Sequence, residues 1–177
     1  MKLITAALLL FFIFPSEVEE EKIRWQEDRR LTWSDFKGTP NGAEEYVAST
    51  NSGVSFSFSY TVKNGKDYVN YSVNCNFYPQ LSWYRPERVN EYILKHEQAH
   101  FDISELHARK LRLLLSDIPK DENFKEIAGK LYHKMEDERR AMQERFDSDS
   151  DHSNIKLEEF RWREYISEQL AEYDPWK

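Results

Sequence analysis

The sequence has a single cysteine and fewer basic than acidic side chains. Cys75 is the single cysteine, so no disulfide can form within the chain, and we expect this residue to be buried as a small apolar side chain in a strand. Acidic residues outnumber basic ones by 32 to 25, a net charge of −7. This balance argues against a nucleic-acid backbone or an anionic membrane surface as the partner.

A long apolar run is also missing. The longest one, residues 3–14, reaches only about half to two-thirds of the roughly 20 residues that a transmembrane helix needs. It follows Lys2 and precedes a string of glutamates, which is the order of a secretory signal peptide. We therefore predict a signal peptide over residues 1–18 and one domain over residues 19–177, secreted or periplasmic, with no stable membrane insertion after removal of the signal. A retained anchor or a buried helix is the alternative.

The remainder contains the aromatic residues that disordered chains lack, at 15% of the whole sequence, and its clearest pattern is a hairpin. Apolar residues alternate with serine, threonine and asparagine on both sides of Asn64-Gly65. This turn dipeptide between alternating strands predicts a tight β-hairpin. A two-residue turn pairs Tyr60 with Val69 and brings every apolar residue to one face, which we expect to be buried. The opposite face would be open to water or to an extended ligand.

Helical periodicity begins after the hairpin. From Pro86 onward apolar residues recur every three or four positions, and Pro119 ends this pattern near residues 117–119. A second helix is predicted from Asp121 to Phe146, followed by a polar loop at 147–154 and a third helix around residues 160–170. Strands followed by helices indicate an α+β fold, with an N-terminal antiparallel hairpin or sheet and then two to three helices.

Residues 96–100 read His-Glu-Gln-Ala-His within the first predicted helix. On a helix His96 and His100 lie on one face, where both imidazoles can bind one zinc ion. Glu97 is rotated by about 100°, so it can act as a general base beside the ion. The alternative is a pair of ordinary helix histidines that hydrogen-bond to their neighbours. Burying two imidazoles without a role would be costly, which favours the zinc interpretation.

A catalytic zinc site needs a third protein ligand. His107 is about 10 Å further along the helix axis and cannot reach the same ion. If the second helix packs antiparallel on the first, Glu138 comes close from its apolar stripe, and Asp147 and His152 come close from the loop after it. Glu138 could instead pair with Arg112, and His152 could be a solvated loop residue, so the spacing alone leaves the third ligand open.

Three segments together resemble a bacterial family of predicted secreted zinc-dependent proteases that is catalogued as a domain of unknown function. They are Leu-Thr-Trp-Ser-Asp-Phe-Lys-Gly at 31–38, Leu-Lys-His-Glu-Gln-Ala-His-Phe-Asp-Ile at 94–103 and Phe-Asp-Ser-Asp-Ser-Asp-His-Ser at 146–153. Trp162 matches a later tryptophan of the family. Phe146 stands where relatives usually have tyrosine; if that tyrosine hydroxyl helps to hold an oxyanion in relatives, this chain lacks it.

The resemblance implies that His152 belongs to the active site as the third zinc ligand, with Asp147 orienting a ligand imidazole. The expected protein is an exported, zincin-like metallopeptidase that holds Zn²⁺ with His96, His100 and His152. It would hydrolyse peptide or protein substrates with a zinc-activated water and Glu97 as general base. An extended peptide could add to the strand at residues 68–77. The alternative is a non-catalytic binding or scaffold protein of the cell envelope, with a structural zinc or no metal.

Overall fold

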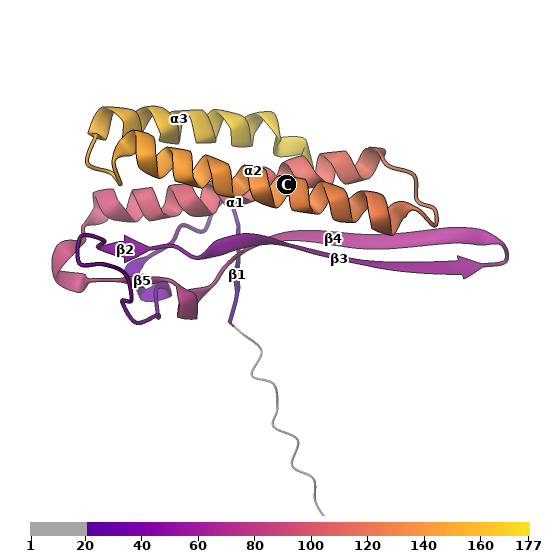
Figure 1. The fold of residues 1–177 in the computed structure, drawn as a ribbon, viewed down its shortest axis with the longest axis horizontal. Coiled ribbons are helices and arrows are strands. Elements are labelled where there is room, and N and C mark those ends of the chain that lie inside the picture. Colours follow the sequence, from indigo (N-terminus) through magenta and orange to yellow (C-terminus); the bar gives the residue numbers. More distant parts are fainter. Residues whose placement is uncertain (1–20) are drawn as a thin grey trace, which may run out of the picture.

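The computed structural model describes residues 21–177, so the predicted signal peptide at residues 1–18 lies outside the described residues. Strands come first and helices later, which confirms the α+β prediction (Figure 1). A three-stranded antiparallel sheet has the order β1-β4-β3, and a second sheet pairs β2 with β5. Within residues 21–177 no helix is long and apolar enough to span a membrane. The bounds are β1 Ile23–Arg24, β2 Ala48–Ser49, β3 Ser52–Lys63, β4 Lys66–Phe77, β5 Trp83–Tyr84, α1 Glu91–Asp117, α2 Phe124–Ser150 and α3 Lys156–Glu172.

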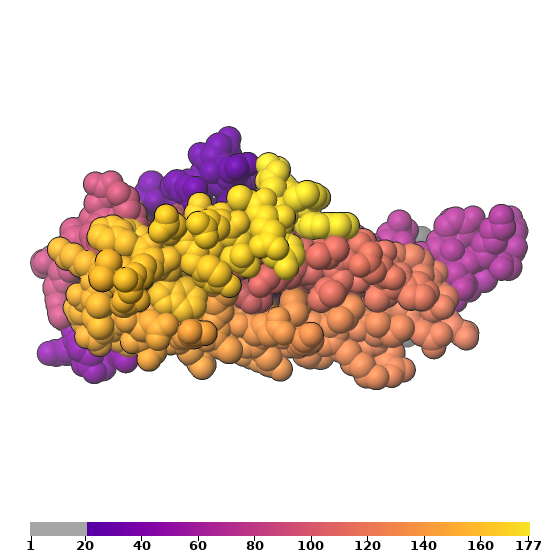
Figure 2. Space-filling model, turned by 90° about the horizontal axis from the view of Figure 1, so that it is seen from above, coloured from indigo at the N-terminus to yellow at the C-terminus, as the bar shows by residue number. Residues whose placement is uncertain are grey.

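The β3–β4 hairpin has the predicted register, with Tyr60 opposite Val69 along a ladder that turns at residues 64–65. Near the body its apolar face packs on α2, where the hydroxyl of Tyr132 donates to the carbonyl of Val54 at 3.0 Å. The expectation of one buried face holds only there. The tip extends past the helices (Figures 1 and 2). Residues 60–68 are exposed because no helix covers them.

The helix boundaries differ from the prediction at two ends. Residues 86–88 form a 3-10 turn, and α1 begins only after Asn90, whose side-chain oxygen accepts hydrogen bonds from the amides of Tyr92 and Ile93. At the other end, α2 continues to Ser150 instead of ending at Phe146. The Ser150 hydroxyl is buried and donates to the carbonyl of Phe146 at 2.7 Å, so this polar sequence remains helical. Asp147 is therefore a helix residue and not part of a loop.

Two hydrophobic clusters hold the layers together. One lies between the sheet and the helices, and the other lies among the three helices and contains Ile103, Phe146 and Ile166. Cys75 belongs to the first cluster and is 1% exposed, which confirms the expectation of a buried cysteine. Burial raises the pKa of its thiol well above the usual value.

The N-terminal segment is tied to the back of α1. Asp102 accepts hydrogen bonds from the Trp25 indole at 2.7 Å and from the Gln98 amide at 2.8 Å. The Gln98 side-chain oxygen in turn accepts the Leu31 amide at 2.7 Å. Two polar residues of the segment 94–103 therefore anchor the chain, and they lie on the side of α1 away from its histidines.

The Trp-Ser-Asp-Phe segment forms a short 3-10 helix, Trp33–Asp35, and packs under the small sheet. The Trp33 ring stacks on Tyr84 of β5 with centroids 4.9 Å apart, and Phe36 meets Phe77 edge-on at 5.1 Å. Because β5 pairs with β2, this aromatic layer fixes the position of β2 beside α1.

Candidate metal centre

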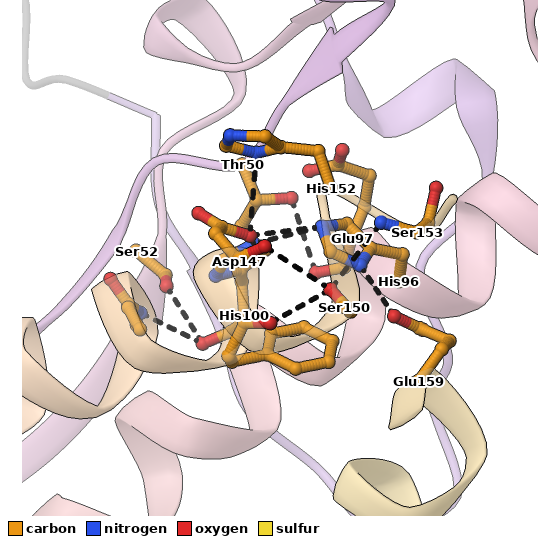
Figure 3. A network of polar contacts seen from close by, with 12 residues as sticks. Thr50, Ser52, His96, Glu97, His100, Asp147, Ser150, His152, Ser153 and Glu159 are labelled. Atoms are coloured by element: carbon orange, nitrogen blue, oxygen red, sulfur yellow. Dashed lines mark hydrogen bonds and ion pairs between the residues drawn. The ribbon is translucent and has the colours of Figure 1, made fainter. Parts of the chain in front are cut away.

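A cleft of about 470 Å³ opens between α1, α2, β2 and the loop that follows α2. Its walls include all four residues singled out from the sequence, His96, Glu97, His100 and His152 (Figure 3). Residues 41–42 and 45–50, Trp83 and the cleft-facing side of α2 contribute most of the remaining lining.

Helix α1 brings its two histidines together as the spacing predicts. His96 and His100 are one turn apart, and their Nε2 atoms are 3.2 Å from each other. Their side chains are 7% and 12% exposed, so both rings are largely removed from solvent. The paired imidazoles point their Nε2 atoms into the cleft (Figure 3).

Helix α2 supplies the third converging atom. It packs antiparallel on α1, and the Gln143 amide donates to the carbonyl of His100 at 3.1 Å. One turn further on, Asp147 Oδ1 lies 3.1 Å from His96 Nε2 and 2.9 Å from His100 Nε2. Among the described residues, these three side chains form the group whose ligand atoms lie close enough together to hold one metal ion.

The geometry fits a zinc ion. Ligands at about 2.0–2.1 Å in a tetrahedron lie about 3.3–3.4 Å from one another, close to the 2.9–3.2 Å between these three atoms. Asp147 Oδ1 is buried and has no hydrogen-bond partner among residues 21–177, although two imidazole nitrogens are nearby. Asp147 Oδ1 and the two imidazole nitrogens therefore face a common point. Two imidazoles and one carboxylate are a donor set that zinc accepts.

Neighbouring charges shift the pKa values of His96 and Asp147 in opposite directions. Burial alone would lower the pKa of His96, but the carboxylates of Asp147 and Glu159 outweigh it and raise this pKa to about 9. Burial alone would likewise raise the pKa of Asp147, but the imidazoles of His100 and His96 hold it well below its usual range.

Glu159 on α3 is a site residue that the sequence reasoning missed. Its carboxylate is 0% exposed, and its Oε2 lies 2.9 Å from His96 Nδ1. An Nδ1–H that donates to this carboxylate leaves the Nε2 lone pair of His96 directed into the cleft, as metal-binding histidines require. In the sequence Glu159 is indistinguishable from Glu158 beside it, which pairs with Arg161 at the surface.

His152 lies at the same cleft but outside the converging group. Its side chain is 50% exposed, its Nδ1 is 3.9 Å from Asp147 Oδ1, and its ring meets Tyr46 edge-on at 5.2 Å. Residues 151–153 all have positive φ angles, and the amide of His152 donates to the carbonyl of Asp147 at 2.9 Å. Asp147 thus lies closer to His96 and His100 than His152 does, and a ligand role for His152 stays a prediction.

Glu138 does not face the cleft. Its side chain is 47% exposed and pairs with Lys134 at 3.7 Å. The inward residues at this level of α2 are Met135 and Arg139, so the expectation of an inward Glu138 is wrong. The alternative pairing with Arg112 is also wrong, because Arg112 binds Glu105. His107 is a core residue, and its Nδ1 donates to a backbone carbonyl of α1.

Phe146 supports the histidines from behind. It is fully buried, stacks on His96 with centroids 4.6 Å apart and meets His100 edge-on at 5.2 Å. Trp162 of α3 packs on its other side at 5.9 Å. Position 146 is not among the residues that line the cleft, so a side chain here orients the imidazoles and does not contact a ligand in the cleft.

Glu97 completes the centre. The residue is 4% exposed, lines the cleft, and its Oε2 is buried without a hydrogen-bond partner among residues 21–177. Its backbone carbonyl accepts the Thr50 hydroxyl at 3.2 Å, which ties this turn of α1 to the segment after β2. A buried carboxylate oxygen without a partner is costly, so a group that enters the cleft and hydrogen-bonds to Glu97 Oε2 would be bound favourably.

Comparison with known proteins places the chain in a family. No curated protein and no solved structure matches it. A family model described as "Bacterial protein of unknown function (DUF922)" matches residues 26–153. The match includes the aromatic segment at 33–36, both histidines of α1, Asp147 and His152, whereas Glu159 lies beyond its end. The chain therefore belongs to the DUF922 family of bacterial proteins of unknown function.

Proposed function

We propose that this protein is a zinc-dependent metallopeptidase in which His96, His100 and Asp147 hold the ion and Glu97 is the general base. The observation that carries the proposal is the convergence of three ligand atoms in an open cleft, beside Glu97, whose buried Oε2 has no hydrogen-bond partner in the described residues. Asp147 replaces His152 as the favoured third ligand because its oxygen is the one within 3.1 Å of both imidazoles. Export to the cell envelope, predicted from residues 1–18, is part of the same proposal.

Each residue has a defined task. A bound zinc ion would polarise a carbonyl group and lower the pKa of a water molecule. Glu97 accepts a proton in the cleft and passes it to the leaving amine. Glu159 holds His96 in the tautomer that presents Nε2. Phe146 keeps both rings in place and excludes water from their rear faces.

A peptide would approach along β2 and not along β4. No residue of β4 lines the cleft, so peptide addition at residues 68–77 would place the peptide away from the proposed metal site and is not favoured. Residues 47–50 do line the cleft. The amide of Arg85 donates to the carbonyl of Val47, so antiparallel alternation directs the backbone groups of Ala48 and Thr50 away from β5. These groups could pair with an extended peptide.

The alternative is a non-catalytic envelope protein with a structural metal or none. Structural zinc sites are usually closed by four protein ligands, whereas three ligands and an open cleft are typical of catalytic ones. The difference is tested at Glu97, because a structural site does not need its carboxylate. Glu97→Gln should retain the metal and lose peptide hydrolysis.

The first experiment is the zinc content of the purified protein beside His96→Ala/His100→Ala. One zinc per chain, lost in the double variant, supports the metal site. Peptide cleavage that disappears in Glu97→Gln, with zinc content unchanged, supports the enzyme. A protein that binds no zinc at neutral pH would overturn both parts of the proposal. Zinc bound without any cleavage would favour the non-catalytic alternative.

A further inference from the structure

The cleft around the histidines carries an excess of negative charge. Four carboxylates line it, against the single guanidinium of Arg140. Two of them, Glu97 and Asp147, belong to the proposed metal site, where a divalent cation would balance their charge. The other two, Glu45 and Glu144, are exposed residues on different walls of the cleft. Their charge remains when the metal is bound.

Glu144 is not neutralised by its own helix. Arg140 lies four residues earlier, a spacing at which ion pairs form on helices, but its guanidinium pairs with Asp137. Among the described residues Glu144 has no ion pair or side-chain hydrogen bond. Other acidic residues of α2 do, as Glu136 does with Arg139 at 2.9 Å. The carboxylate of Glu144 is therefore free to bind a cationic group that enters the cleft.

Glu45 lies on the opposite wall, in the segment before β2. Two arginines are nearby, but both donate to backbone carbonyls. Arg85 binds the carbonyl of Tyr46 at 3.0 Å, and Arg88 binds the carbonyl of Glu44. Neither forms an ion pair with Glu45, so within the described part of the chain this carboxylate also has no cationic partner.

We infer that the cleft selects polypeptide segments with a lysine or arginine next to the bond at the metal site, and that Glu144 and Glu45 recognise this charge. The inference rests on the proposed function. The partnerless buried oxygen of Glu97 in the same cleft marks it as a ligand site and not only an acidic surface. Glu144 is less than one helical turn from Asp147, within reach of a long cationic side chain beside the reacting carbonyl.

Three blocked, fluorescently labelled nonapeptides test this inference. They share six positions of alanine and phenylalanine, and the other three positions are all lysine in the first peptide, all glutamine in the second and all glutamate in the third. Binding is measured on zinc-loaded Glu97→Gln, which should hold a peptide without cleaving it. We expect the lysine peptide to bind about 10-fold more tightly than the glutamate peptide at low salt, with a smaller difference at 0.5 M salt. Cleavage of each peptide by the wild-type protein is followed separately by mass spectrometry.

Variants assign the discrimination to residues. In the Glu97→Gln background, Glu45→Gln/Glu144→Gln should bring the lysine-to-glutamate ratio close to one, and Glu144→Lys should reverse it. Glu168→Gln is the matched control, because Glu168 is also exposed and unpaired in the described region but lies on α3 away from the cleft. It should leave the ratio unchanged.

The outcomes separate the two claims. Equal binding of the three peptides, or no measurable binding of the lysine peptide, would overturn the charge selectivity. A ratio that survives the double glutamine change would overturn the recognition by Glu45 and Glu144. Cleavage of all three peptides at equal rates would do the same and leave the peptidase proposal standing. A lysine preference without cleavage by the wild-type protein would support the charged cleft and count against the enzyme.

Discussion

Removal of Asp147 tests which side chain is the third ligand. Its Oδ1 lies 3.1 and 2.9 Å from the two imidazole nitrogens, whereas the His152 ring is half-exposed and outside this group. Loss of a partner that only orients a ligand typically weakens metal binding 10- to 100-fold. Loss of a direct ligand should cost more, so we expect Asp147→Ala to weaken zinc binding by more than about 100-fold, or about 2.8 kcal/mol. His152→Ala should change it by less than about 10-fold.

The assay is competition for zinc against a chromophoric chelator at pH 7.5. Far-ultraviolet circular dichroism of the metal-free variants provides the control for folding, and Asp147→Asn provides a variant of equal size. The reverse order of effects, with zinc lost in His152→Ala and retained in Asp147→Ala, would refute the argument from geometry. It would establish His152 as the ligand that the family resemblance implies.

Three further predictions concern residues around the site and in the core. Glu159→Leu should weaken zinc binding about 10- to 100-fold in the same assay, whereas Glu158→Gln at the surface should have no effect. Phe146→Ala should lower the free energy of unfolding by about 3–5 kcal/mol in urea, because the ring is fully buried. Burial lowers the pKa of His107 to about 4 from 6.5, so between these values the unfolded chain binds a proton that the folded chain does not. His107 should therefore contribute a loss of stability of up to about 3 kcal/mol as the pH drops from 6.5 to 4, and the fall should be smaller by this amount in His107→Gln.

Features set by neighbouring residues could be predicted from the sequence. The turn at Asn64-Gly65 and the alternation beside it fixed the hairpin register, because a one-residue slip would turn every apolar side chain outward. The four-residue spacing of His96 and His100 placed both rings on one face of a helix. In both cases the geometry of one element is sufficient.

Features that depend on packing between distant segments could not be predicted. His96 and its carboxylate partner Glu159 are 63 residues apart, and no spacing rule links them. The choice among Glu138, Asp147 and His152 depended on where α2 ends. Ser150 keeps the last turn helical, so Asp147 is held at the level of the imidazoles and not in a loop. The apolar stripe predicts an inward Glu138, but its neighbour Arg139 occupies the buried position on α2.

The ligand atoms come from the N-terminal half of α1 and the C-terminal end of α2, and the chain joins these helices at the opposite end through residues 118–123. A cation held by all three side chains would link the two helices at the end where the chain does not connect them, as residues 118–123 do at the other end. Depletion of zinc would then remove this link, and the packing of buried Phe146 against α1 and α3 would be left to hold the end of α2 in place.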